Sequence, residues 1–419
     1  MGDTPSLARI SCGDKSRPHR ADAIRPEARA LFVPAWRHWG EMGRRCHAGV
    51  VQTNLNTARE WVAQAGGRVL FLLGAGASKP ALPVSAELTN IVLTSIDEAT
   101  TNFAAESRVP ELWRDIRPVV VSMGSNIEDL YQAVETLAYR NSDPTRFWVN
   151  GFIEFPTYGG DTVALARDAQ WILDMIQGHT LGELDAAQAN APLDHFEPLL
   201  RADKTGIVTL NYDQLIERAG EKFGVKVSTG AELWDRGFQW HFETAAVHLL
   251  KMHGSMTWRG SRSTNHESGN LVPAVGFYET RDLNEAAPNR LLTPTVIFGS
   301  GSKTTPFSAF PALTRQFHDW LEESELLVVV GYSFRDQHVD AAIRRWASLS
   351  PSRRIVVIDP YPRRHIRQDD DTLGGLLWAM DAEYRTPDAD APSVAATLGK
   401  NRMIFLTGGV ESLLPALVT

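Results

Sequence analysis

The chain has 419 residues, of which 43% are hydrophobic and 22% charged, and its formal net charge is −8. This length and composition are typical of a soluble globular protein with one to three domains. The acidic balance favours neither a nucleic-acid groove nor an anionic membrane surface as a direct partner. Two cysteines, Cys12 and Cys46, are too few for a disulfide scaffold or a four-cysteine zinc module, so we expect no metal.

The start of the chain contains no apolar segment of the secretory type, and no apolar run approaches the ~20 residues of a membrane helix. We therefore expect a cytoplasmic protein that does not bind membranes. Residues 1–65 form an N-terminal part in this interpretation, with a polar tail followed by helices at 26–42 and 57–64.

The next segment, residues 69–73, is apolar throughout, which predicts a parallel strand buried on both faces. It runs into Gly74-Ala75-Gly76-Ala77-Ser78, where two glycines allow a tight turn and the close approach of a phosphate-bearing ligand. Lys79 stands where a dinucleotide-binding fingerprint has its third glycine, and a P-loop sequence is absent. The alternative is a plain glycine turn at the end of a buried strand.

Residues 84–205 have a helical pattern, which predicts an insert that forms a cap or a small second domain. Within it, Asn126 precedes apolar residues at helical spacing and is the expected N-cap.

After the insert, apolar strand patterns alternate with helical ones to the end of the chain. This alternation predicts an α/β fold, a doubly wound, Rossmann-like parallel sheet over residues 66–419 with a mostly helical insert. Ligands of such sheets bind at the carboxyl ends of the strands. Small or polar residues follow five predicted strands, at Gly74–Ser78, Asn211–Asp213, His253–Ser255, Gly331–Ser333 and Asp359.

Four of these segments, in this order, resemble the motifs of the sirtuin family of NAD-dependent proteins. They are Gly74-Ala75-Gly76-Ala77-Ser78, Thr209-Leu210-Asn211-Tyr212-Asp213, Lys251-Met252-His253-Gly254-Ser255 and Gly331-Tyr332-Ser333-Phe334. The similarity is greatest to the bacterial sirtuin-like branch that degrades NAD in antiphage defence. It implies a sirtuin-type sheet with NAD as substrate.

The resemblance also implies a role for each motif. Asn211 would face the nicotinamide ribose and His253 would act as a base beside it. The remaining residues would bind NAD: Gly74, Ala75, Gly76 and Ser78 at the diphosphate, Asp213 at the nicotinamide amide, and Gly331, Ser333 and Asp359 at the adenosine half.

Each of these side chains also has a purely structural interpretation. Asn211 and Asp213 precede a predicted helix and are good Asx-turn or N-cap residues. The alternative for Ser333 and Asp359 is that each stabilises its own turn, and a histidine at a strand end is often structural. Glu217 is assigned to a solvated helix face.

Protein-deacylating sirtuins carry a four-cysteine zinc ribbon, which this chain cannot form. We therefore expect an enzyme that hydrolyses NAD to nicotinamide and ADP-ribose. The alternatives are a non-catalytic NAD or ADP-ribose sensor and, third, a protein deacylase or ADP-ribosyltransferase. By analogy with the family, we expect a homo-oligomer, with a helicase-like ATPase or an Argonaute-type protein as defence partner.

Overall fold

The computed structural model divides the chain into two units, residues 1–47 and 48–419. It describes residues 54–79, 81–122, 126–138, 155–234, 239–261, 263–264, 271–272, 277–279, 292–296, 309–360 and 402–419. All of these belong to the second unit. The tail and the helix expected at 26–42 lie outside the described residues, as do both cysteines.

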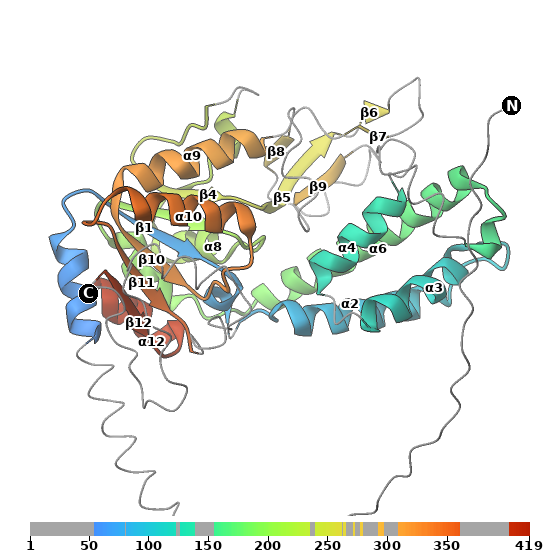
Figure 1. The fold of residues 1–419 in the computed structure, drawn as a ribbon, viewed down its shortest axis with the longest axis horizontal. Helices are drawn as coiled ribbons and strands as arrows, with labels where there is room; N and C mark the ends of the chain where they lie inside the picture. The colour runs from blue at the N-terminus through green and yellow to red at the C-terminus, as the bar shows by residue number, and fades with distance from the viewer. Residues whose placement is uncertain are drawn as a thin grey trace, which may run out of the picture. The chain divides into compact units, whose positions relative to one another are not determined.

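Seven strands form the central sheet, in the order β12-β11-β10-β1-β2-β4-β3, and every neighbouring pair is parallel (Figure 1). The strands are β1 (Arg68–Leu73), β2 (Thr205–Thr209), β3 (Val227–Ser228), β4 (Val247–Lys251), β10 (Ser324–Val330), β11 (Arg354–Ile358) and β12 (Met403–Leu406). The glycine-turn strand β1 is the middle strand, so the turn that follows it lies at the centre of the carboxyl edge.

Alternate residues of β1 enter two separate cores, one on each face of the sheet. Leu70 and Leu72 pack with α9 (Phe310–Glu322) and α10 (Gln337–Leu349). Phe71 and Leu73 pack with the helix at 54–64, with α8 (Leu215–Phe223) and with α12 (Val410–Val418). Figure 1 shows α9 and α10 on one side of the strands and α12 on the other. The predicted doubly wound parallel sheet is confirmed.

The segment between β1 and β2 is mostly helical, as the sequence predicts. Its elements are η1 (Ala75–Ser78), α2 (Ser85–Thr100), α3 (Val109–Ser122), α4 (Ile127–Ala138), η2 (Pro156–Tyr158), α6 (Thr162–Gln188), η3 (Asp194–Phe196) and α7 (Glu197–Arg201). Asn126 does cap α4, because its Oδ1 accepts the backbone N–H groups of Glu128 at 2.9 Å and Asp129 at 3.0 Å.

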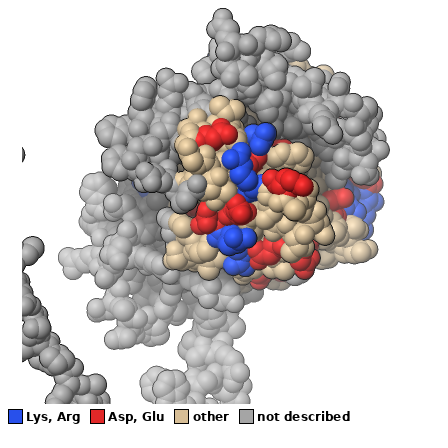
Figure 2. All heavy atoms as spheres, turned by 90° about the vertical axis from the view of Figure 1, so that its right-hand side faces the viewer, with Lys and Arg blue, Asp and Glu red and all other residues tan. Residues whose placement is uncertain are grey.

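Charged side chains of the insert pair with one another. Buried Asp168 accepts a hydrogen bond from Tyr158 at 2.9 Å and faces the guanidinium groups of Arg108 and Arg167. Figure 2 shows acidic and basic side chains interspersed on the face it presents. A mixed surface of this kind does not attract a polyanion.

Short antiparallel strands follow β4. The larger set is β8-β5-β9, made of β5 (Gly254–Ser261), β8 (Phe277–Glu279) and β9 (Leu292–Val296). The smaller is the pair β6 (Ser263–Thr264) and β7 (Leu271–Val272). Among the described helices, none is long and apolar enough to cross a membrane. The described part of the chain contains no cluster of three or more side chains suited to a metal ion.

The buried histidine His195, in η3, makes stability depend on pH. Its side chain is 7% exposed, no described residue hydrogen-bonds its Nε2, and burial lowers its pKa from 6.5. As the pH falls through 6.5, the pKa of this histidine in the unfolded chain, the unfolded chain binds a proton at His195 that the folded chain does not bind. Stability is therefore lost on acidification. Burial lowers the pKa of His248 as well, so this residue contributes in the same direction.

We predict that His195→Leu flattens the decline in melting temperature between about pH 7.5 and pH 5.5. Exposed His241, replaced by leucine, is the matched control and should leave the slope unchanged. Thermal unfolding, followed by circular dichroism at several pH values, measures the slope of melting temperature against pH. An equal slope in wild type and His195→Leu would show that His195 does not titrate on unfolding.

Candidate functional site

The carboxyl ends of five neighbouring strands meet at one edge of the sheet. Backbone hydrogen bonds continue the ladder into the segments beyond the strands: Gly74 donates to Val330, and Met252 donates to Thr209, each at 2.9 Å. Gly331 donates to Ile358 at 2.9 Å, and Asp359 donates to Leu406 at 3.2 Å. All five polar segments predicted from the sequence therefore lie side by side, on β11, β10, β1, β2 and β4.

The two glycine turns at the centre of this edge pack directly against each other. Gly76 donates a backbone hydrogen bond to the Gly331 carbonyl at 2.8 Å. Gly331 has a φ of +59°, and a Cβ built on it would lie 2.3 Å from the Gly76 carbonyl carbon. A Cβ on Gly74 would lie 2.6 Å from the Gly331 carbonyl oxygen. Glycine is therefore needed at these positions because the facing turn of the chain fills the space beside each Cα. The sequence interpretation assigns that space to a ligand.

Ser78, Asn211 and Asp213 form one hydrogen-bonded network. Asn211 Nδ2 donates to the Gly74 carbonyl and to Ser78 Oγ, both at 2.9 Å, and Ser78 Oγ donates to Asp213 Oδ2 at 2.7 Å. Both amide hydrogens of Asn211 are used, and no donor among the described residues reaches its Oδ1. The amide therefore offers a ligand an oriented, uncharged acceptor.

The second oxygen of Asp213, Oδ1, accepts the backbone N–H of Leu215 at 3.1 Å. Oδ1 thus forms an Asx turn that leads into α8, while Oδ2 connects this turn to Ser78. The N-cap residue of α8 is Gln214, not Asp213. A carboxylate accepts up to about four hydrogen bonds, so this one can still accept from an amide.

A buried ion pair supports this network from below. The fully buried Lys251 ammonium contacts Glu217 at 2.6 Å and also donates to the Asp213 carbonyl. Burial raises the pKa of the Glu217 carboxyl, and the Lys251 charge opposes that shift. The prediction that Glu217 lies on a solvated helix face is wrong, because its side chain is only 17% exposed and faces this lysine.

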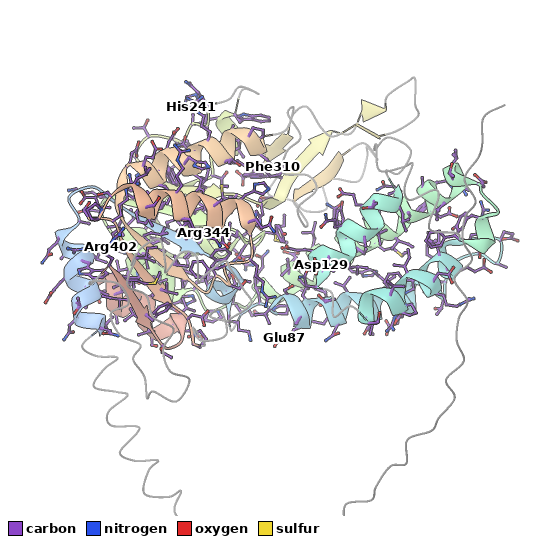
Figure 3. All side chains as sticks on the ribbon, viewed as in Figure 1. Glu87, Asp129, His241, Phe310, Arg344 and Arg402 are labelled. Atoms are coloured by element: carbon purple, nitrogen blue, oxygen red, sulfur yellow. The ribbon has the colours of Figure 1, made fainter. Side chains whose placement is uncertain are left out.

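His253 follows β4, the strand next to β2, and Asn211 follows β2. Its Nε2 is 2.8 Å from Asp336 Oδ2, and its ring centroid is 6.3 Å from that of Tyr212. It lines a cavity of about 410 Å³ together with Met252, Asp336 and residues of α9 and α10. One of these is Phe310, which Figure 3 shows at the end of α9 near β5.

The other predicted residues occupy the same edge without joining the network. Ala75 is exposed at the tip of the glycine turn, and Ser333 is half-buried in the turn after β10. Asp359 is 8% exposed at the end of β11.

The helical insert reaches this edge through two polar contacts. Gln188, at the end of α6, accepts the backbone N–H of Gln214 at 3.0 Å. Tyr212 Oη donates to Glu128 of α4 at 3.4 Å. Burial and the Glu128 carboxylate, followed by Asp336, raise the pKa of the Tyr212 phenol well above its ordinary value, so it stays neutral.

Two residues at the site were not predicted from the sequence. In the sequence, Asp336 is recognisable only as the start of a helix, because it stands immediately before the helical pattern of α10. Lys251 is part of a quoted motif, but no pattern indicated that a lysine inside a strand would be fully buried and paired with α8.

We predict that Gly331→Ala destabilises the fold far more than Gly224→Ala. Both glycines have positive φ, but nothing lies within 4 Å of a Cβ on Gly224, while a Cβ on Gly331 meets the Gly76 turn. Each change costs about 1 kcal/mol for the left-handed backbone, and overpacking adds roughly 1–3 kcal/mol at Gly331 alone. Urea unfolding measures the difference. Equal losses would mean that the two turns separate without cost.

We predict that Lys251→Met lowers the free energy of unfolding by about 3–5 kcal/mol, because it leaves the Glu217 carboxylate buried without its cation. The double variant Lys251→Met with Glu217→Leu should recover most of this loss, since no charge stays behind. A double-mutant cycle from urea unfolding measures the coupling. Additive single losses would contradict the pairing.

Comparison with known proteins gives a family match for the segment that carries the later residues of the site. Residues 205–379 match the family described as SIR2-like domain. This segment is less than half of the chain and contains Asn211, His253 and Gly331, but not the Gly74–Ser78 turn. No curated protein matches the chain.

Among solved structures, one described as a structural basis for the mechanism and regulation of Sir2 enzymes is 12% identical, with a TM-score of 0.39; the match covers 88% of this chain and 97% of that one. A Sir2 homologue mutant in complex with 2′-O-acetyl ADP ribose is 15% identical, with a TM-score of 0.40, and 86% and 93% of the chains are covered. A Sir2 homologue–NAD complex is 14% identical, with a TM-score of 0.34 and coverage of 87% and 92%. At these values the likenesses assign no role to any residue here. Over residues 205–379, the chain matches the SIR2-like domain family.

Proposed function

We propose that this protein is an NAD⁺ hydrolase that cleaves the nicotinamide–ribose bond to give nicotinamide and ADP-ribose. One observation carries the proposal: Asn211 and His253 follow the adjacent strands β2 and β4, and His253 lines a cavity of about 410 Å³. The match of residues 205–379 to the SIR2-like domain family supports NAD as the substrate.

The residues at this edge suit such a cleavage chemically. Breaking a glycosidic bond of this kind develops positive charge on the ribose. Asn211 Oδ1 can accept a hydrogen bond from a water or a ribose hydroxyl, and its amide stays neutral at every pH. The imidazole of His253 can act as a general base. In this proposal Asn211 orients the nucleophile and His253 is the general base.

The remaining residues of the edge are assigned to binding. The diphosphate would lie along the turn of Gly74, Ala75, Gly76 and Ser78, whose tip at Ala75 is exposed. The nicotinamide amide would meet Asp213, and the adenosine half would lie toward Gly331, Ser333 and Asp359. We also propose that the enzyme depletes NAD in antiphage defence, as a homo-oligomer with a partner protein.

We predict that the purified protein releases nicotinamide from NAD, and that Asn211→Ala and His253→Ala each reduce release by at least about 100-fold. Liquid chromatography of the reaction products measures the rate. The protein is assayed alone and with extract of phage-infected bacteria, so that a need for activation does not hide the activity.

Two exposed residues provide matched controls, Asn102→Ala and His241→Ala. Figure 3 shows His241 at the upper margin of the view. Both controls should keep the wild-type rate. No release by wild type under either condition would reject the hydrolase. Tight NAD binding in calorimetry without turnover would establish the sensor instead.

A further inference from the structure

Asp336 is the buried carboxylate that faces the proposed base, and it lies outside the motifs that suggested the function. Its Oδ2 is 2.8 Å from His253 Nε2, and the two side chains are 7% and 9% exposed. At such burial a hydrogen bond to a charged acceptor is strong and directional.

The carboxylate of Asp336 is held by groups that can only donate to it. Its other oxygen, Oδ1, accepts the backbone N–H groups of His338 at 3.0 Å and Val339 at 3.4 Å, which makes Asp336 the N-cap of α10. The N-terminus of a helix also favours a negative charge at this place. The carboxylate is therefore anchored to a 13-residue helix, at a place where hydrogen-bond donors and the helix N-terminus favour its negative charge.

A buried tyrosine fixes the backbone at the same point. The Asp336 backbone N–H donates to Tyr332 Oη at 3.0 Å, and that hydroxyl donates to Asp340 Oδ1 at 2.9 Å. Tyr332 is 5% exposed and belongs to the turn that packs on Gly74 and Gly76. Asp336 is thus positioned both by α10 and by the turn at the centre of the sheet edge.

We propose that Asp336 is a positioning residue that fixes His253 as its Nε2–H tautomer, so that Nδ1 is the nitrogen that accepts the proton in the reaction. An ionised carboxylate only accepts hydrogen bonds, so Nε2 must carry the hydrogen in the contact with Asp336. In the neutral imidazole, Nδ1 is then the unprotonated nitrogen. The catalytic part of this inference rests on the proposed NAD cleavage, but the tautomer does not.

Asp336→Asn provides a sharp test. The asparagine keeps its oxygen on the N–H groups of His338 and Val339, because asparagine is a good N-cap. Its NH₂ group then replaces Oδ2 and donates to His253 Nε2, which favours the opposite, Nδ1–H tautomer. We expect a folded protein with KM for NAD within about twofold of wild type and kcat reduced roughly 10²–10⁴-fold.

The tautomer is measured directly by NMR on protein labelled with ¹⁵N in histidine, with the His253 signals assigned from their loss in His253→Gln. At a pH where the ring is neutral, wild type should show a protonated Nε2 and an unprotonated Nδ1, and Asp336→Asn the reverse. Asp336→Ser keeps an N-cap oxygen but is too short to reach His253, and it should show a mixture with reduced kcat.

Asp161→Asn is the matched control, because Asp161 caps α6 through the Ala164 N–H at 3.0 Å and no histidine contact accompanies it. It should leave both kcat and the His253 spectrum unchanged. An Nδ1–H tautomer in wild type, or full kcat in Asp336→Asn, overturns the inference. If wild type cleaves no NAD, the proposed function fails while the spectra still decide the role of Asp336 toward His253.

Discussion

The contact between the two glycine turns is the constraint on which the site depends. Gly76 donates to the Gly331 carbonyl at 2.8 Å, and neither turn has space for a side chain at the contact. Because the turns follow the neighbouring strands β1 and β10, their packing fixes the positions of the segments at this edge of the sheet. The Asn211 side chain is hydrogen-bonded to the Gly74 carbonyl of the first turn. The Asp336 backbone N–H is hydrogen-bonded to Tyr332 of the second turn.

Polar groups around this contact are paired in a way that leaves few atoms for a ligand. The amide hydrogens of Asn211 and both oxygens of Asp213 already serve the chain. What remains is an oriented acceptor at Asn211, the unused acceptor capacity of Asp213 and an imidazole held at Nε2. Preorganised groups of this kind lose little freedom when a substrate binds, which is the condition for effective catalysis.

Below the edge, a buried ion pair stands where apolar side chains could pack at no loss of stability. Lys251 is fully buried with Glu217, and its ammonium also donates to the Asp213 carbonyl. Such a pair adds little net stability, since desolvation offsets its attraction. Its consequence is geometric: the lysine connects β4 to the Asp213 carbonyl, in the turn between β2 and α8, and to Glu217 of α8. The insert reaches the same turn through Gln188.

The sequence by itself determined the parallel doubly wound sheet, the helical insert and the strand ends that carry polar residues, because apolar periodicity and glycine turns are local signals. It also identified Asn126 as the start of a helix, which the structure confirms. Only the tertiary structure decided that Gly331 packs on Gly76, that Glu217 faces Lys251 and that Asp336 faces His253. These pairs are separated by long stretches of chain, and no local pattern records which strand ends become neighbours or which side chains then come within hydrogen-bonding distance.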